Sequence, residues 1–268
     1  MLQKLAGHHA RKRFGQNFLN DPHWIGRIVD SIDPKPGDCL IEIGPGQAAL
    51  TREVIAKSGH ETAVEIDRDL AAWLRGLFEP GQLDLIEADA LKLDWQAVCP
   101  GRKLRIFGNL PYNISSPILF ALIAVSPRVA DQHFMLQREV VDRMVSPPGN
   151  RTYGRLSAML QRYYRMHKLF DVPPGAFTPA PKVTSSVVRM IPLPRDPGAV
   201  SDEVYAEVVA ASFSMRRKTL RNALGKLLSA DEIRAAGVAP EARAETLSVG
   251  AFEALARALV EKRRSLAV

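Results

Sequence analysis

Short apolar runs alternate with stretches of helical spacing along the first 140 residues. The runs lie at residues 39–43, 61–66, 83–87, 104–107 and 131–136, and each has the length of a buried strand. Between and before them, residues 22–32, 48–57, 68–78 and 115–125 repeat apolar positions at three- and four-residue intervals, which predicts amphipathic helices. Strands that alternate with helices in this way predict βαβ units, and so a Rossmann-like α/β fold with a parallel, doubly wound sheet.

The pattern changes beyond residue 170. Proline-rich turns at residues 173–174 and 178–181 precede a β-rich run at 184–191, which we expect to be antiparallel and to close the sheet. Residues 192–198 form the clearest linker, and helical spacing follows it from Ser201, over about 217–228 and after Ser248. We therefore expect an α/β domain over residues 1–195, which begins with a basic arm, and a small all-helical domain over residues 199–268.

Charge narrows the choice of partner. The 268-residue chain has a formal net charge of +7 and an isoelectric point of about 9.6. Its cations gather near residues 4–13, 216–221 and 262–264. One such cluster is commonly a solvated face, but three in one chain favour a nucleic-acid partner.

Several other classes of protein are disfavoured. The two cysteines, Cys39 and Cys99, lack metal-ligand spacing, so neither a zinc site nor a disulfide framework is expected. The longest apolar stretch, residues 118–125, is far shorter than the ~20 residues of a membrane span. The basic N-terminus has no apolar segment of the kind that a secretory signal needs. These features predict a cytoplasmic protein without a metal. No strong apolar patch stands out beyond the periodicity of the core, so we expect a monomer.

The first predicted strand leads into a glycine loop, Gly44-Pro45-Gly46, which suits close approach of a ligand to the backbone. Together with Ala49 and Glu65 the loop matches a dinucleotide fingerprint, so the loop alone leaves an NAD site open. Glu42, two positions before Gly44, favours a cationic sulfonium ligand over a pyrophosphate. Asp89, just after the third strand, can accept a hydrogen bond from an adenine amino group.

The fourth strand ends in Asn109-Leu110-Pro111-Tyr112, a run that hydride transfer does not require. The amino group of adenine is a poor nucleophile because its lone pair is delocalised into the ring. An Asn side-chain oxygen and a carbonyl fixed before proline can accept from that amine, and the aromatic ring can hold the base by stacking. Gly44, Glu65, Asp89 and Asn109 follow the first four strands, one for each, at the edge where such sheets bind ligands.

Five segments in this order resemble the ribosomal RNA adenine dimethyltransferases, in particular those of the bacterial small subunit. They are residues 14–19, Glu42–Gly46, Val64–Asp67, Asn109–Ile114 and Phe177–Val183. The glycine loop is generic, whereas Asn-Leu-Pro-Tyr followed by Phe-x-Pro-x-Pro-Lys-Val is specific. Ala48 stands where many methyltransferases carry a third glycine, and we expect this to have only a modest effect on the loop.

The resemblance implies that S-adenosylmethionine is the methyl donor. The residues implied to bind it are Asn17 and Leu19 near the methionine end, Gly44 at the methionyl and ribose portion, Glu65 at the ribose hydroxyls, and Asp89 at the adenine amino group.

The implied catalytic residues surround the target amine. They are Asn109 between the sulfonium methyl and the amine, the Leu110 carbonyl as second acceptor, and Tyr112 and Phe177 on the two faces of the base. For Phe177 an alternative stays open, that of a core aromatic in a proline-rich turn.

The implied reaction is in-line attack of adenine N6 on the sulfonium methyl, without a covalent enzyme intermediate or an essential histidine. Its substrate would be two adjacent adenosines in a hairpin loop near the 3′ end of 16S rRNA, in the immature small subunit. The candidate RNA contacts are Arg11, Lys12, Arg13, Arg216, Arg217, Lys218 and Arg221. Alternatives are a large-subunit rRNA dimethyltransferase, a DNA adenine methyltransferase, or an RNA-binding assembly factor with incidental catalysis.

Overall fold

The computed structural model describes residues 16–196, 198–215 and 217–266. The chain forms two compact units, of which the first comprises Met1–Val141 and Arg165–Pro192. The second unit comprises Asp142–Tyr164 and Leu193–Val268, so two separate segments of the chain build it. The sequence-based division placed a single boundary at residues 195–199 and did not assign the earlier segment to the helical part.

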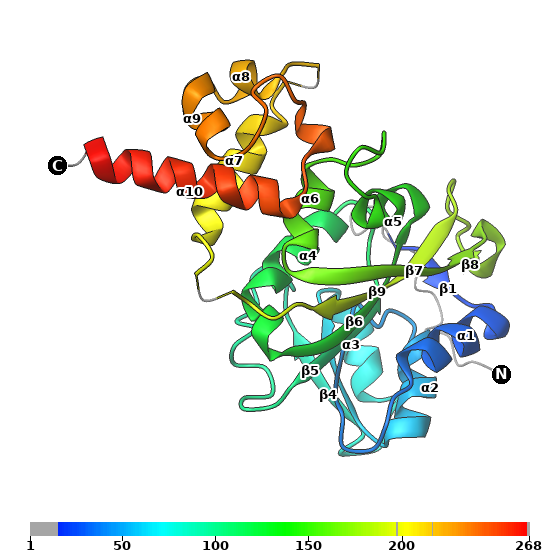
Figure 1. Ribbon diagram of the computed structural model, residues 1–268. Coiled ribbons are helices and arrows are strands. Elements are labelled where there is room, and N and C mark those ends of the chain that lie inside the picture. The colour runs from blue at the N-terminus through cyan, green and yellow to red at the C-terminus, as the bar shows by residue number, and fades with distance from the viewer. Residues whose placement is uncertain (1–15, 197, 216, 267–268) are drawn as a thin grey trace. The chain divides into compact units, whose positions relative to one another are not determined.

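The first unit is built on a seven-stranded sheet with the order β4-β3-β2-β5-β6-β9-β7 (Figure 1). The strands are β2 (Cys39–Ile43), β3 (Glu61–Glu65), β4 (Leu83–Glu87), β5 (Leu104–Asn109), β6 (Val129–Gln137), β7 (Tyr164–Val172) and β9 (Ser185–Pro192). The strands from β4 to β6 pair in parallel, and β9 pairs antiparallel with β6. The predicted parallel sheet and the antiparallel β9 are therefore confirmed, but β9 does not close the sheet, because β7 lies outside it at the edge.

The sheet grows outward from β2 in both directions, because the chain adds β3 and β4 on one side and then β5 and β6 on the other. The β2–β5 pair is thus the topological switch point, where sheets of this kind bind ligands beyond the carboxyl ends of their strands. Gly108 allows the two strands to approach closely at this point. A Cβ added to Gly108 would collide with the carbonyl oxygen of Ile43 and lie 3.3 Å from the Ile43 nitrogen.

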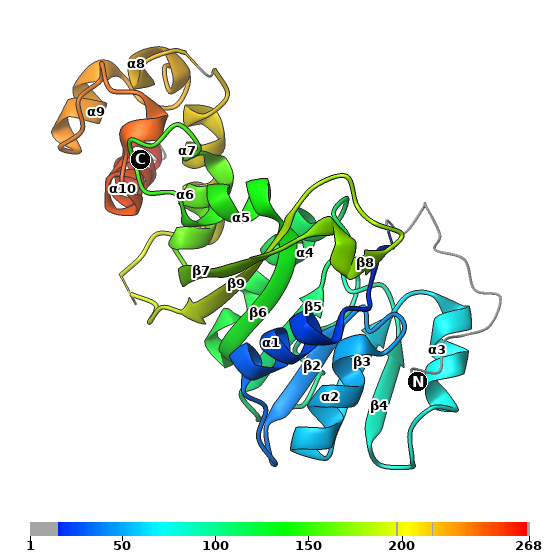
Figure 2. The same ribbon diagram turned by 90° about the vertical axis from the view of Figure 1, so that its right-hand side faces the viewer.

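Helices α1 (Pro22–Ile32) and α2 (Ala49–Ser58) lie side by side over one face of the sheet (Figure 2). Their apolar faces bury Ile28, Val29 and Leu50 together with sheet residues such as Phe107 and Met135. The chain also forms α3 (Arg68–Arg75), α4 (Ser115–Ala121) and the 3₁₀ helix η2 (Leu122–Arg128), so the helix predicted over 115–125 tightens at its second half.

A small ribbon ties the start of the described chain to a segment 158 residues later. Strand β1 (Phe18–Leu19) pairs antiparallel with β8 (Phe177–Thr178), which follows the short 3₁₀ helix η3 (Pro174–Ala176). Leu19 lies opposite Phe177, and the Asn20 amide donates to the Ala176 carbonyl at 2.9 Å.

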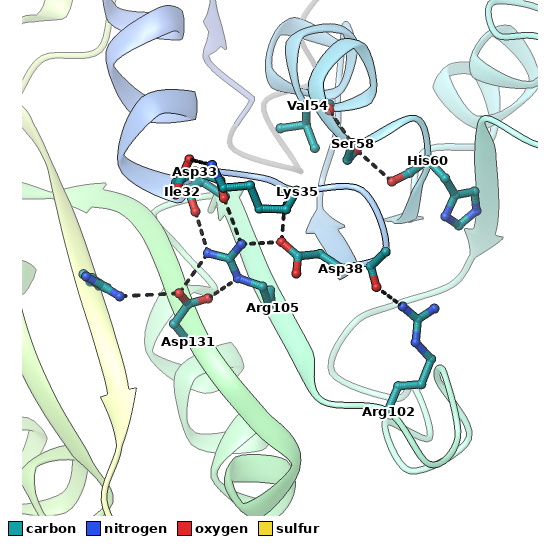
Figure 3. A network of polar contacts seen from close by, with 12 residues as sticks. Ile32, Asp33, Lys35, Asp38, Val54, Ser58, His60, Arg102, Arg105 and Asp131 are labelled. Atoms are coloured by element: carbon teal, nitrogen blue, oxygen red, sulfur yellow. Dashed lines mark hydrogen bonds and ion pairs between the residues drawn. The ribbon is translucent and has the colours of Figure 1, made fainter.

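An arginine-centred network holds the amino ends of three strands, at the edge opposite the switch point (Figure 3). Arg105 at the start of β5 donates to Asp131 on β6 at 3.0 Å and to Asp38 before β2 at 2.6 Å. It also donates to the carbonyl oxygens of Ile32 and Asp33, which end α1. The network joins α1, β2, β5 and β6 at the amino edge of the parallel strands. The functional site lies at the opposite, carboxyl edge.

The second unit is helical. Its elements are α6 (Arg155–Gln161), α7 (Asp202–Ser212), α8 (Leu220–Ala223), α9 (Ala230–Ala235), the 3₁₀ helix η4 (Ala244–Thr246) and α10 (Val249–Leu266), and α5 (Arg138–Val145) leads into it. Tyr205 and Phe252 are fully buried with their rings edge to face. Arg162 binds Glu253 at 2.6 Å and stacks on Tyr205. The helix predicted over 217–228 contains only the four helical residues of α8.

Candidate active site

A cavity of about 300 Å³ opens at the carboxyl edge of the parallel strands. The segments that follow β2, β3, β4 and β5 line it, together with residues 16–19. The structure brings together here every residue predicted to bind the cofactor, and three of the four residues predicted to be catalytic. These lining residues are Asn17, Leu19, Gly44, Glu65, Asp89, Asn109, Leu110 and Tyr112.

The glycine loop presents backbone rather than side chains to the cavity. Gly44 and Gly46 have φ angles of +70° and +55°, which glycine adopts without strain. A Cβ on Gly46 would lie 3.2 Å from two ring carbons of Phe18, so this ring packs directly on the loop. Ala48, the departure from the family pattern, has a φ of +59° and is fully buried. The loop therefore keeps its left-handed turn without a third glycine, at a strain of about 1 kcal/mol.

Two carboxylates lie at the cavity on neighbouring strands. Glu65, 4% exposed at the end of β3, accepts from the Gly46 amide at 3.3 Å and from the Asp67 amide at 2.8 Å. Burial raises the pKa of Glu65, while both backbone donors act against that rise. Asp89 accepts from the Leu91 amide at 2.9 Å. Backbone amides thus fix the orientation of both acceptors.

Asn109 connects the fourth parallel strand with the arm. Its side-chain nitrogen donates to the Asn17 carbonyl at 3.0 Å. This contact directs the amide so that the remaining polar atom, the side-chain oxygen, is the one suited to accept from a substrate amine. The next residue, Leu110, is buried, and its amide donates to the Met135 carbonyl on β6 at 3.2 Å. The two predicted acceptors for the amine are therefore anchored to different segments, Asn109 to the residue before β1 and Leu110 to β6.

Tyr112 is held by a contact that the sequence did not indicate. Its hydroxyl lies 2.7 Å from the hydroxyl of Ser185, which is fully buried at the start of β9. Burial raises the pKa of Tyr112, so the phenol stays protonated at neutral pH. The hydroxyl contact fixes the plane of a ring that lines the cavity.

Phe177 does not line the cavity. It is 3% exposed and packs in the core cluster with Leu19, Ile25 and Val172. This position corresponds to the alternative of a core aromatic. Stacking on a target base stays a prediction, and it requires the ring to leave this cluster while β8 remains paired with β1.

The basic residues predicted to contact RNA fall into two groups. Arg11, Lys12, Arg13 and Arg216 lie outside the described residues. Arg217, Lys218 and Arg221 are exposed, and none of them forms an ion pair with another residue of the described part of the chain. By contrast, Lys262 and Arg263 of the tail cluster bind Glu232 at 3.0 Å and Glu207 at 2.7 Å. Two of the three tail cations are therefore already paired, whereas the exposed cations at the start of α8 and just before it have no ion pair with a described residue.

Sequence reasoning missed several residues of the site. Phe18 and Gln16 lie inside the run at residues 14–19, but their contacts join segments that are distant in sequence. Phe18 packs on Gly46, and the Gln16 side chain donates to Asp67 at 3.2 Å. Ser185 follows the Pro-Lys-Val motif by two residues and carried no signal of its own. Among the described residues, no group of His, Cys, Asp or Glu is arranged to hold a metal ion. None of the described helices is both long enough and apolar enough to cross a membrane.

A switch-point cavity, a glycine loop after the first parallel strand and a ribose-type carboxylate on the second are common to Rossmann-like folds that bind nucleotide ligands. The Asn109, Leu110 and Tyr112 wall beside them fits the class I S-adenosylmethionine-dependent methyltransferases. Residues 7–260 match the family described as "Ribosomal RNA adenine dimethylase", and the chain belongs to this family. It is thereby an S-adenosylmethionine-dependent enzyme that modifies adenine in ribosomal RNA, as the sequence predicted.

Individual relatives agree with this assignment. "Ribosomal RNA small subunit methyltransferase A" of Bordetella petrii is 54% identical over 258 residues, which covers 96% of this chain and 98% of the relative. The protein of the same name from Aromatoleum aromaticum is 52% identical over 259 residues, covering 96% and 97%. Among solved structures, the 23S rRNA methyltransferase ErmE has a TM-score of 0.70 at 25% identity, covering 91% of this chain and all of that one. A dimethyladenosine transferase from Plasmodium falciparum shares the fold, with a TM-score of 0.76 at 24% identity over 94% and 98% of the two chains.

Proposed function

We propose that the protein transfers methyl groups from S-adenosylmethionine to N6 of two adjacent adenosines in a hairpin loop near the 3′ end of 16S rRNA. The product would be N6,N6-dimethyladenosine, formed on an immature small subunit in the cytoplasm, by a monomeric enzyme that uses no metal. Support for the substrate comes from the relatives named as small-subunit enzymes, which match nearly the full length of this chain.

The observation that carries the chemistry is the Asn109 side chain, held at 3.0 Å by the Asn17 carbonyl at the edge of the cavity. Its amide oxygen and the Leu110 carbonyl would accept the two N6 hydrogens, which favours a more tetrahedral and more nucleophilic nitrogen. The donor is already activated by its positive sulfur, so positioning and desolvation would provide most of the rate.

Proton removal needs no base from the protein, because the methylated amine is acidic enough to lose its proton to water. No histidine occurs among the described residues that line the cavity. His133 is buried on β6, and burial lowers its pKa to about 4.

The donor would lie along the carboxyl edge of β2, β3 and β4. Gly44 would approach its methionyl and ribose portion, Glu65 its ribose hydroxyls, and Asp89 its adenine amino group. Asn17 and Leu19 would cover the methionine end. The Tyr112 ring would support the target base, and the exposed cations Arg217, Lys218 and Arg221 would bind phosphates of the RNA.

A labelled-methyl assay on three acceptors tests this proposal. Immature small subunits, large subunits and duplex DNA are each incubated with enzyme and labelled donor, and the nucleosides are then separated. We expect N6-methylated and N6,N6-dimethylated adenosine from small subunits only. Label confined to large subunits would overturn the substrate and favour the large-subunit alternative, and label on DNA would favour a DNA adenine methyltransferase.

A variant separates catalysis from binding. Asn109→Ala should abolish transfer while it preserves most RNA binding, because it removes the amine acceptor and leaves the cationic residues intact. Asn150→Ala, at a turn in the second unit, is the matched control and should retain full turnover. Wild-type turnover of Asn109→Ala would show that the site is wrongly assigned. A wild-type protein that binds subunits but transfers no label would favour an assembly factor.

A further inference from the structure

Glu61 is an acidic side chain in a place where no acid is expected. It lies at the start of β3, is 0% exposed, and within the described residues no hydrogen-bond donor reaches either carboxyl oxygen. An ionised carboxylate in such a site would be strongly unfavourable without a partner. The group that it does meet is another carboxyl, that of Glu42.

The strand register explains the contact between the two acids. Glu42 on β2 lies opposite Ala63 on β3, and Glu61 precedes Ala63 by two residues, so both side chains point to the same face of the sheet. Glu42 is 2% exposed and accepts from the Thr51 hydroxyl of α2 at 2.6 Å. It also lines the cavity, whereas Glu61 lies behind it.

Two touching, buried carboxyls cannot both be ionised, because their charges repel in a medium of low polarity. Burial raises the pKa of Glu61 well above its ordinary value, and the neighbouring Glu42 raises it further. Burial also raises the pKa of Glu42, to about 7, although its hydrogen bonds with Thr51 and Glu61 oppose that rise. Of the two carboxyls, Glu61 therefore holds its proton more firmly, and Glu42 is the one that ionises beside the cavity as the pH rises through neutrality.

We propose that Glu61 is a positioning residue that holds a proton against Glu42 and so maintains one negative charge at the wall of the donor cavity. This charge favours the cationic sulfonium of S-adenosylmethionine over the neutral thioether of the product, S-adenosylhomocysteine. The inference rests on the proposed donor and adds a means of telling donor from product. Below neutral pH the pair takes up a second proton and the preference weakens. Donor binding reverses this uptake, and the proton passes to the buffer.

The groups around Glu42 all act on the same balance. From β3, Glu65 faces it as a second acid and raises its pKa. From α2, the facing polar group is the uncharged hydroxyl of Thr51. From β5, the opposite position is Phe107, which has no charge. Thr51 and Glu61 are thus the neighbours whose protons oppose the effect of burial on Glu42, and of these two only Glu61 is itself an acid.

Calorimetry in buffers of different ionisation enthalpy tests the proposal without any turnover. At pH 6.5, binding of S-adenosylmethionine should release roughly half a proton more than binding of S-adenosylhomocysteine. The ratio of the two dissociation constants should favour the donor about tenfold more at pH 8 than at pH 5.5, as expected for one partly screened charge. Equal proton release and a ratio that is constant with pH would overturn the proposal.

Two variants test Glu61 itself. Glu61→Gln keeps a hydrogen-bond donor against Glu42 and should retain the preference for the cationic ligand at pH 8. Glu61→Leu leaves Glu42 buried without that donor and should lose about tenfold of the preference at pH 7, with product affinity unchanged within about twofold. Product affinity and thermal unfolding show whether each variant is folded. If Glu61→Leu does not fold, the proton release of the wild type alone tests the proposal. A leucine variant with the wild-type preference would refute the role, whereas a wild-type protein that binds neither ligand would refute the proposed function as well.

Discussion

The Gly108→Ala substitution should disable the enzyme with the addition of a single methyl group. The new Cβ would lie far inside 3.0 Å of the Ile43 carbonyl oxygen, and 3.3 Å from the Ile43 nitrogen and carbonyl carbon. Real Cβ atoms essentially never approach another atom within 3.0 Å, so the two strands must separate by more than half an ångström. The obstacle is backbone on both sides, and no flexible side chain can yield.

The separation would occur at the point where donor and acceptor sites meet. Ile43 leads directly into the glycine loop, and Gly108 is followed directly by Asn109. Overpacking of this kind destabilises a core by about 1–3 kcal/mol. Misplacement of a reacting group by about 1 Å reduces the rate on the order of a hundredfold. We therefore expect a kcat about a hundredfold lower, with a modest loss of thermal stability.

Single-turnover methyl transfer measures the rate, and urea unfolding measures the stability. Gly26→Ala in α1 is the matched control, since a Cβ there meets nothing within 4 Å. It should stabilise the helix by about 0.5–1 kcal/mol and leave the rate unchanged. If Gly108→Ala kept wild-type turnover and stability, the close approach of β2 and β5 would not position the reacting groups.

Four further outcomes follow from the geometry. Arg105→Met should lower the free energy of unfolding by about 2–3 kcal/mol, because Asp38 loses its ion pair and Asp131 keeps only the longer one with Arg189, at 3.7 Å. Donor binding should be unchanged; urea unfolding measures the stability and a donor titration the binding. Phe177→Ala should lower the free energy of unfolding by about 3 kcal/mol, because it leaves a cavity in the core. A loss of kcat larger than the fraction of unfolded protein explains would show that the ring also contacts the base. Arg221→Ala should reduce by about one the slope of the logarithm of the RNA-binding constant against the logarithm of the salt concentration. Lys262→Ala should not change it, because the ammonium is already paired with Glu232. A wild-type slope near zero, instead of roughly −3 to −4, would exclude this electrostatic contact. Between about pH 5 and 8 the free energy of unfolding should fall more steeply with pH for the wild type than for Glu61→Leu. Because the pKa values of both buried acids are raised, the folded chain retains protons that the unfolded chain releases. Equal slopes in urea unfolding would contradict this.

The parallel half of the sheet was predictable because its strands are buried on both faces and appear as continuous apolar runs. Strand β7 was missed for the opposite reason. It lies at the edge of the sheet, and its residues Arg165, His167 and Lys168 interrupt the apolar pattern. The segment with α5 and α6 was likewise not assigned to the helical unit, since membership of a unit depends on contacts distant in sequence.

Motifs located the cavity well because its residues follow the ends of consecutive parallel strands. They did not reveal what lies behind those residues. Ser185 behind Tyr112 and Glu61 behind Glu42 are contacts between strands, set by register. An acid at the start of a strand is usually solvated, so nothing in the sequence distinguished Glu61 from a surface residue. The burial of Phe177 was similarly undecided, because a motif does not state which side of a turn an aromatic ring occupies.

The position of β9 between β6 and β7 has a consequence for synthesis of the chain. All the described residues that line the cavity lie between positions 16 and 118, so the ribosome completes them early. At that stage β6 is unmade, and once made it presents an open edge until residues 185–192 emerge. Strand β7 is synthesised before β9, its neighbour in the sheet, so it cannot pair with the sheet until β9 is made. A nascent chain can therefore contain every residue that lines the cavity before the sheet that supports them is complete. Strand β9, the last to be synthesised, completes that sheet although none of its residues lines the cavity.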